Sequence, residues 1–338
     1  MKQVRLHPFP LLFTFAFLLF PFALYGCGSE SPKKEVVLYT SVDQPIAAPI
    51  VKEFEQKTGI RVTLVTDAEA TKSVGLAERI RAEKANPQAD VFWGNEPFHT
   101  INLAEEGLLQ PYESPAAKGV RGEFVDPQHR WTSNGLRARV FAVHKESEFF
   151  PNGIEDLAKP EVKGKIAMAC PTAGTTGGHV AALYVLWGDD KAAKFFRTLR
   201  DNEIKLLGGN SVVAQQVGGG NLQMGLTDND DCASAQAGGG QLVQVIPDQQ
   251  EGGIGTLMVP TTIGLVAGSK HADAGKQLID FLLSTEVEGK LIDQKFVGWS
   301  VRDVAPERIK GMDVDLRAVA KCMPAAVREA TAILEGRE

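Results

Sequence analysis

The sequence predicts an α/β protein made of two units, each a mainly parallel sheet with helices on its faces. From residue 35 onward, apolar runs of strand length alternate with segments in which apolar residues recur at helical spacing. The same alternation returns in the middle of the chain, and in both stretches loops rich in small polar residues follow the strands. A β-α-β-α order is typical of parallel sheets, whose ligands bind beyond the carboxyl ends of the strands. We therefore expect a ligand cleft between the two units.

The first unit begins with the strand EVVLYTS, followed by a helix whose apolar residues recur at helical spacing. Pro45 is suited to the first turn of that helix. The runs RVTLV and ADVFWG have the composition of the next two strands. Phe98 and Leu109 belong to one further predicted helix, with Gly107 near its end.

The second unit is predicted from the strands RVFAVHK, GKIAMACP, EIKLL, LQMGL and QLVQVI, with the short helices SVVAQQV and DDCASAQA between the later ones. A last strand, IGLVAGS, leads to an amphipathic helix that carries Leu278, Ile279 and Leu282. Thr285 and Glu288 have the spacing of a capping box, which predicts that the next helix begins there. The sequence has no repeat at a fixed period, which argues against a solenoid.

Residues 1–26 have the plan of a signal peptide, with two basic residues, an apolar stretch over 9–24 and a small residue at the cut. The apolar stretch is shorter than the roughly 20 residues that a membrane-spanning helix needs, and two prolines interrupt it. The Leu-Tyr-Gly-Cys at its end resembles the lipobox of bacterial lipoproteins, which implies cleavage before Cys27 and lipidation of that cysteine. Residues 27–34 then form a polar, lipid-anchored linker, and we expect the protein at the periplasmic face of a bacterial membrane.

The composition argues against several classes of function. The net charge is −6 and no long block of like charge occurs, so nucleic acid is not expected as a partner. Cys170, Cys232 and Cys322 lack the number and spacing of a disulfide framework or a zinc site, although Cys170 and Cys232 could either pair or stay two buried thiols. The sequence contains no G-x-S-x-G, H-E-x-x-H or Walker motif, so we expect a binding protein and not an enzyme.

Candidate ligand-binding residues lie in the loops that follow strands and precede helices. These loops are rich in hydroxyl and amide side chains, and the free N–H groups at helix starts can hold an anion or a polar ligand. The predicted ligand-binding residues are Thr40, Ser41, Asp43, Trp93, Glu96, Thr175, Thr176, His179, Asn210, Ser211, Thr227, Asp228 and Asp231.

The stretch GLTDNDDCASAQAGGG places Asp228, Asp230 and Asp231 between a strand and an Ala-rich helix. One interpretation is a helix N-cap, which stabilises a helix by about 0.5–2 kcal/mol. Another is that Asp228 and Asp231 line the ligand cleft and hold a metal or a cationic group. An EF-hand is excluded because Cys232 and Ala233 stand where its loop needs an oxygen ligand and a glycine.

Three segments of the chain are similar, in the same order, to extracellular solute-binding proteins of bacterial ABC importers. They are VVLYTSVDQPIAAPIVKEFEQKTGIRV, GGNSVVAQQVGGGNLQMGLTD and VPTTIGLVAGSKHADAGKQLIDFLLSTEVE. The resemblance is to the branch that contains ferric-iron binders, and it implies the two-lobed type II periplasmic binding protein fold. It also implies a lobe 1 formed by residues 35–135 and 265–338 and a lobe 2 formed by residues 136–264, with crossings near 133–140 and 258–266.

The resemblance implies that the cargo is ferric iron or another metal ion and that no further cofactor is bound. The carboxylate oxygens of Asp228 and Asp231 are suited to hold such a hard cation and are the predicted metal ligands. Ferric binders of this branch use tyrosines, often adjacent, where this chain has residues 227–231. A small organic solute, such as a phosphonate-type anion or a polyamine, is therefore an alternative cargo. The implied partners are an ABC permease with its ATPase, and we expect a monomer. As an alternative to transport, the protein could serve as a sensory binding lobe.

Overall fold

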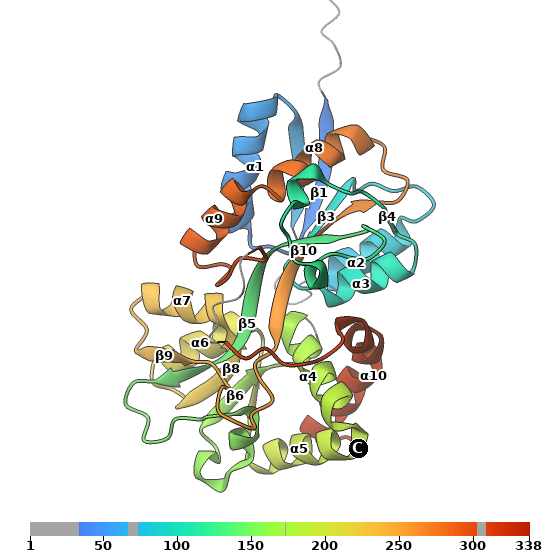
Figure 1. Ribbon diagram of the computed structural model, residues 1–338. Coiled ribbons are helices and arrows are strands. Elements are labelled where there is room, and N and C mark those ends of the chain that lie inside the picture. The colour runs from blue at the N-terminus through green and yellow to red at the C-terminus, as the bar shows by residue number, and fades with distance from the viewer. Residues whose placement is uncertain (1–33, 67–73, 173, 303–308) are drawn as a thin grey trace, which may run out of the picture. The chain divides into compact units, whose positions relative to one another are not determined.

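The computed structural model describes residues 34–66, 74–172, 174–302 and 309–338 (Figure 1). The predicted signal peptide, Cys27 and the linker up to residue 33 lie outside these ranges. Within them, no helix has the length and apolar character that crossing a membrane requires.

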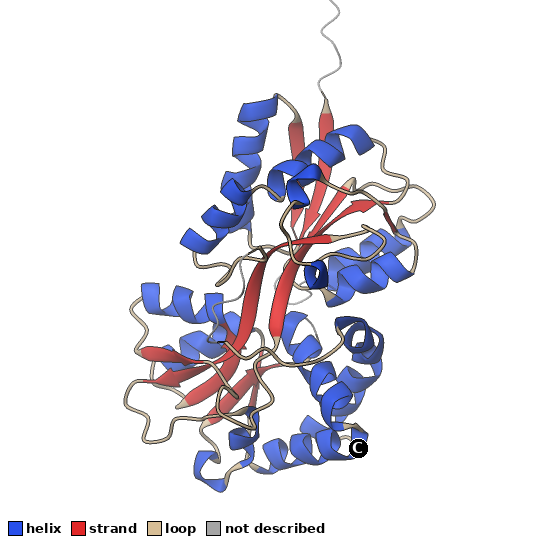
Figure 2. Cartoon of the chain, in the orientation of Figure 1, coloured by secondary structure: helices blue, strands red, loops and turns tan. Residues whose placement is uncertain are grey.

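The strands form a sheet in the order β2-β1-β3-β10-β5-β8-β6-β7, with β4 paired to β10 and β9 paired to β5. Figure 2 shows helices on the faces of this sheet at both of its ends. The strands are β1 Glu35–Thr40, β2 Arg61–Thr66, β3 Val91–Gly94, β4 Leu109–Gln110, β5 Thr132–His144, β6 Ile166–Ala169, β7 Lys205–Leu207, β8 Met224–Asp228, β9 Leu242–Val245 and β10 Met258–Val266. The α-helices are α1 Gln44–Thr58, α2 Val74–Ala82, α3 Phe98–Glu105, α4 Gly174–Trp187, α5 Asp189–Asp201, α6 Asn210–Gly218, α7 Asn229–Ala237, α8 Ala272–Leu282, α9 Thr285–Asp293 and α10 Leu316–Leu334.

Two parallel parts of the sheet are joined by two long antiparallel strands. β1 pairs in parallel with β2 and β3, and β6 pairs in parallel with β7 and β8. β10 pairs antiparallel with β3 at one end and with β5, which in turn pairs antiparallel with β8. Figure 1 shows β5 and β10 running from one part to the other. The predicted α/β class with two lobes is confirmed.

Two predicted element ends are wrong, and both errors have a local cause. Leu109 lies in β4 and not in a helix, because Gly107 adopts a positive φ of 71° and reverses the chain after α3. The helix α9 is capped by Ser284, whose hydroxyl accepts a hydrogen bond from the Val287 N–H. The carboxylate of Glu288 does not complete the predicted capping box, because it accepts the N–H of Val301 instead.

The last helix, α10, lies within residues 265–338, which are predicted to belong to lobe 1. α10 packs against α4 and α5, whose residues fall in the predicted lobe 2, and also against α3. Its buried residues Val319, Met323 and Ile333 belong to the same apolar core as Leu183 and Phe196. An amphipathic helix settles where its apolar face is buried, and here that place is the surface of α4 and α5. The lobe boundaries themselves stay a prediction.

Candidate functional site

The predicted ligand loops meet around one buried carboxylate at the end of β8, Asp228. Its Oδ1 accepts a hydrogen bond from Arg139 Nη1 at 2.6 Å, and its Oδ2 accepts from Arg137 Nη2 at 2.9 Å. Thr175 Oγ1 also donates to Oδ2 at 2.6 Å, and Asn210 Nδ2 does so at 3.2 Å. The structure therefore brings three predicted residues together, and their common partners are two arginines that the sequence analysis did not select.

The two arginines lie on β5, within its apolar run from Leu136 to Val143. Arg137 and Arg139 are two residues apart and so point to the same face of the strand. Their side chains are 4% and 0% exposed, which is rare for arginine unless it is paired. The signal that could have found them is this spacing, since two charged side chains on one face of a buried strand need buried partners.

The other two aspartates of the cluster have different roles. Asp230 Oδ1 accepts from Arg137 Nη2 at 2.6 Å and from Arg137 Nε at 3.1 Å. Asp231 Oδ2 accepts from Thr227 Oγ1 at 3.2 Å. One carboxylate oxygen from each of Asp228, Asp230 and Asp231 lies within 4.8 Å of the others, so the three could hold a metal ion. Asp228 precedes α7 as its N-cap residue, but its side chain makes no capping hydrogen bond, so the N-cap interpretation of that carboxylate is wrong.

Burial and the arginines set the charges of the site. Burial alone would raise the pKa of the Asp228 carboxyl, but the guanidinium groups of Arg139 and Arg137 outweigh it and hold that pKa below its ordinary value. Burial raises the pKa of Asp230, and the charge of Arg137 opposes this only in part. Burial, with the nearby charge of Arg139, lowers the pKa of His179 to about 3, so the imidazole is neutral at physiological pH.

Several buried N–H groups of the site have no hydrogen-bond partner in the part of the chain that the structure describes. They include Nε and Nη2 of Arg139 and Nε1 of Trp93, and Nδ1 of His179 is also without a partner. These three side chains are 0–2% exposed. A buried polar group without a partner costs about 1–3 kcal/mol, so an arrangement of this kind favours a ligand that supplies acceptors.

The loops of the first part of the sheet bind mainly to each other. Thr40 Oγ1 donates to the carbonyl of Trp93 at 2.8 Å, and Ser41 Oγ donates to Asn95 Oδ1 at 3.0 Å. Glu96 is buried, which raises its pKa, and its carboxylate accepts the N–H of Phe98 at 2.6 Å at the start of α3. The link to the second part is Arg137, whose Nη1 donates to the carbonyl of Asn95 at 3.3 Å.

The remaining predicted residues lie at the starts of helices. Asp43 is the N-cap residue of α1, and its charge acts on Asp230. Thr176 Oγ1 donates to Asn210 Oδ1 at 2.9 Å. Ser211 lines a groove between α6 and α7 together with Asp231. Thr176 is thus part of the contacts around Asp228, whereas no direct hydrogen bond of Asp43 or Ser211 to that carboxylate occurs among the described residues.

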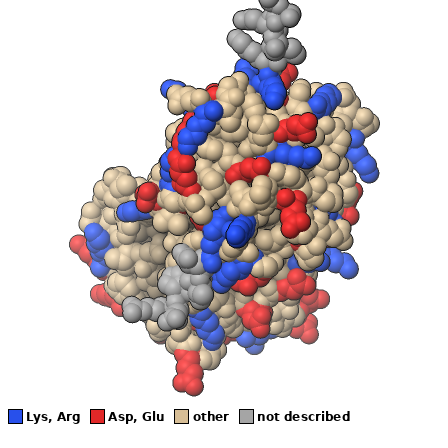
Figure 3. All heavy atoms as spheres, turned by 45° about the horizontal axis from the view of Figure 1, so that its top comes forward, with Lys and Arg blue, Asp and Glu red and all other residues tan. Residues whose placement is uncertain are grey.

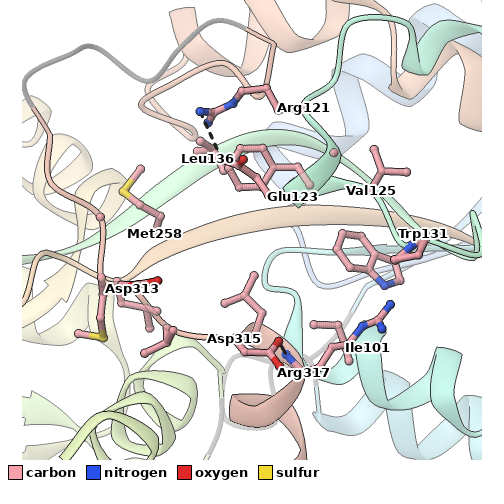
Figure 4. A pocket seen from close by; sticks show the side chains of 18 of the residues that line it. Ile101, Arg121, Glu123, Val125, Trp131, Leu136, Met258, Asp313, Asp315 and Arg317 are labelled. Carbon is pink, nitrogen blue, oxygen red and sulfur yellow. Dashed lines mark hydrogen bonds and ion pairs between the residues drawn. The ribbon is translucent and has the colours of Figure 1, made fainter.

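A separate cavity of about 750 Å³ lies beside the two long strands and contains none of the predicted ligand-binding residues. Figure 4 shows Trp131, Leu136 and Met258 around it. The charged groups at its edge include Arg121 and Glu123, which form an ion pair at 3.3 Å. On the face shown in Figure 3, basic and acidic side chains lie among each other without a large area of one sign.

The cysteines are free thiols in the structure. Cys170 and Cys322 are half-buried and Cys232 is buried, and none of the three forms a disulfide. Of the two predicted alternatives for Cys170 and Cys232, unpaired thiols are therefore the observed one.

This arrangement, in which polar segments of two α/β lobes meet at buried charged groups, is that of a solute-binding protein. Residues 35–294 match the family of bacterial extracellular solute-binding proteins, and the chain belongs to that family. Members bind their solutes outside the cytoplasm and work with the permease and ATPase of an ABC importer. The protein therefore functions in transport and is not an enzyme.

The relatives differ in the solutes that their names state. Iron uptake protein A1 of Synechocystis is 25% identical over 278 residues, which cover 78% of this chain and 75% of that protein. The putative 2-aminoethylphosphonate-binding periplasmic protein of Salmonella paratyphi A is 27% identical over 285 residues, covering 80% and 79%. Iron-bound HitA of Pseudomonas aeruginosa matches with a TM-score of 0.77 at 23% identity, over 88% of this chain and 99% of HitA. That likeness confirms the predicted type II periplasmic binding protein fold.

Proposed function

We propose that this chain is the lipid-anchored binding component of an ABC importer and that it delivers a small organic solute with a phosphonate-type or phosphate group to the permease. It acts by binding alone, since a ligand that contacts both lobes favours the conformation in which they hold it. The lipid anchor rests on the lipobox-like end of the predicted signal peptide at Cys27. The choice of solute rests on the groups at the end of β8.

The observation that carries the choice of solute is the state of Arg139. Its Nη1 is bound by Asp228 and Thr175, but its Nε and Nη2 have no partner in the described chain, although the side chain is fully buried. A guanidinium presents its donors as a rigid fork that matches phosphate and carboxylate oxygens. The indole N–H of Trp93, at the end of β3 in the other part of the sheet, is a second buried donor without a partner in the described chain. Such donors suit an oxyanion and repel a metal cation.

The tyrosines do not supply the phenolates of a ferric site. Tyr39 OH donates to Glu83 Oε2 at 3.0 Å, and Tyr112 OH donates to Asp280 Oδ1 at 2.8 Å. Tyr184 is buried in the apolar core. The phenol groups of these tyrosines are thus engaged elsewhere in the protein. Burial, and then the neighbouring carboxylate, raises the pKa of Tyr39 and of Tyr112 to about 12.

A metal ion is the second candidate cargo. The observation in its favour is the approach of the Asp228, Asp230 and Asp231 carboxylates to within 4.8 Å of one another. The names of the iron-uptake relatives point the same way. Against it, Asp228 and Asp230 already bind the guanidinium of Arg137.

Calorimetry of the purified mature protein tests the proposal with 2-aminoethylphosphonate, inorganic phosphate, ferric citrate and spermidine as probes. We expect an oxyanion to bind, and Arg139→Lys to weaken its binding at least tenfold, about 1.4 kcal/mol. Lysine keeps the charge beside Asp228 but lacks the fork of donors, so the thermal unfolding of this variant should stay close to that of the wild type. Binding of ferric iron alone, unaffected by Arg139→Lys, would contradict the proposal.

A further inference from the structure

We infer that Arg137 is the specificity-determining residue of the site, because its guanidinium occupies the position among the carboxylates of Asp228, Asp230 and Asp231 that a metal ion would otherwise take. The inference rests on the proposed function and deepens it, since it gives the reason why an anionic solute is accepted and a metal ion is refused.

The geometry of the guanidinium resembles that of a coordinated cation. Arg137 Nη2 is 2.9 Å from Asp228 Oδ2 and 2.6 Å from Asp230 Oδ1, and Nε is 3.1 Å from the same Asp230 oxygen. The side chains of Arg137, Asp228 and Asp230 are 4%, 2% and 12% exposed, so water screens their charges little. One nitrogen therefore bridges two of the three carboxylates that could have formed a metal site.

The guanidinium is also held from its other side. Arg137 Nη1 donates to the carbonyl of Asn95 at 3.3 Å, and the ring of Phe296 lies 5.3 Å from the guanidinium carbon. A metal ion could not enter without displacing this group or lying beside a buried positive charge. Arginine keeps its charge at any physiological pH, so it cannot make room by losing a proton.

The neighbouring arginine gives a second, independent observation. Both oxygens of Asp228 are already bound, Oδ1 by Arg139 and Oδ2 by Arg137 and Thr175. Arg139 nevertheless keeps two buried nitrogens without a partner among the described residues. What the buried nitrogens of this site lack is thus hydrogen-bond acceptors. With Arg137 as the internal counter-charge of the carboxylates, the donors of Arg139 are left for the solute.

The test is the gain of a metal site in Arg137→Gln, measured with Tb³⁺, a hard cation that prefers carboxylate oxygens. We expect Arg137→Gln to bind one Tb³⁺ at least tenfold more tightly than the wild type at neutral pH. The double variant Arg137→Gln/Asp230→Asn should lose this gain. Arg137→Lys is the matched control, and because it keeps a positive charge it should bind Tb³⁺ no better than the wild type.

If Arg137→Gln does not fold, the inference is tested in a protein that keeps Arg137. In that case Asp230→Asn is introduced with Arg137 present, and the inference requires that the affinity for Tb³⁺ stays unchanged. A tenfold loss of Tb³⁺ affinity in this variant would overturn the inference, as would a folded Arg137→Gln that gains nothing.

The proposed function is tested separately by calorimetry of the wild type with 2-aminoethylphosphonate and inorganic phosphate. Absence of binding there would contradict the proposed function while leaving the exclusion of metal by Arg137 intact. A failed gain of Tb³⁺ binding together with normal anion binding would overturn the inference alone.

Discussion

The polar loops at the two ends of the sheet have similar compositions but differ in what their side chains bind. The first-half loops, residues 40–43 and 93–96, mostly satisfy each other through pairs such as Ser41 with Asn95. By second-half loops we mean the helix starts and strand end at residues 175–179, 210–211 and 227–231. They surround charged groups of β5 and leave Arg139 with unpaired nitrogens. The difference teaches that a polar loop after a strand is a candidate ligand site only where some of its buried groups remain without a partner.

The largest effect should come from removing the carboxylate at the centre of the second-half loops. In Asp228→Ala, the buried guanidinium of Arg139 loses its only carboxylate partner among the described residues, and that of Arg137 loses one of two. Breaking a buried ion pair by removing one partner costs about 3–5 kcal/mol of stability. Urea unfolding measures the loss, and Asp201→Ala, at an exposed aspartate, is the control that should cost less than about 1 kcal/mol. If Asp228→Ala lost as little stability as the control, buried ion pairs would not distinguish the second-half loops from the first-half loops.

The second effect is the pH dependence that His179, in the second-half loops, should give to the stability of the protein. The pKa of His179 is about 3 in the folded protein, against an ordinary value of 6.5. Between these values the unfolded chain binds one more proton than the folded one, so stability is full above pH 6.5 and falls as the pH is lowered. The slope is about 1.4 kcal/mol per pH unit, or roughly 2–3 kcal/mol by about pH 4.5.

His179→Gln should flatten the decrease over this window, because glutamine does not titrate. Unfolding free energies at several pH values above about 4.5 compare the two proteins before carboxylates begin to take up protons in the unfolded chain. Parallel curves for the wild type and His179→Gln would show that His179 is protonated without cost in the folded protein.

A smaller effect is expected in the first-half loops. Ser41→Ala removes both hydrogen bonds to Asn95 and leaves the buried Asn95 N–H without this acceptor. The expected loss of stability is about 1–2 kcal/mol, with solute affinity within twofold of the wild type. Thermal unfolding and calorimetry check the two values, with the exposed Ser234→Ala as the control. A tenfold loss of affinity in Ser41→Ala would place the first-half loops in direct contact with the solute.

The smallest effect tests the exception in the first-half loops. Trp93 is buried and its Nε1 has no partner among the described residues. If this N–H donates to the solute, Trp93→Phe should weaken binding about threefold, the size of one neutral hydrogen bond. Trp131→Phe, in the cavity away from the ligand loops, is the control that should leave affinity unchanged. Equal affinities of the two variants would assign Trp93 to packing alone.

Much of the fold could be predicted because it depends on local periodicity. The alternation of apolar strands and helices follows from patterns within short windows, and so does the run IGLV at the end of β10. The ends of elements were harder, since a single glycine at 107 and a serine at 284 decided them. The packing of α10 on α4 and α5 could not be predicted, because an amphipathic helix does not specify which apolar surface will cover it.

The sequence indicated several residues that the structure brings together, but it did not indicate the charges that balance them. Thr175, Asn210 and Asp228 were expected and are found together. Asp228 is bound by Arg137 and Arg139, which lie about ninety positions earlier in the chain. A pairing between such distant residues leaves no trace in a single sequence. The sequence therefore predicted Asp228 and Asp231 as metal ligands, whereas the structure adds two arginines whose charges balance that of Asp228.

The position of β10 in the sheet also has a consequence for the order of synthesis. β10 lies between β3 and β5, so that Val91 pairs with Leu265. A nascent chain cannot complete the sheet that β1, β2 and β3 begin until residue 266 has left the ribosome. Contacts between such distant parts of a chain form slowly, and the incomplete sheet has an open edge until then. The part of the sheet formed by β1, β2 and β3 therefore stays incomplete through most of translation.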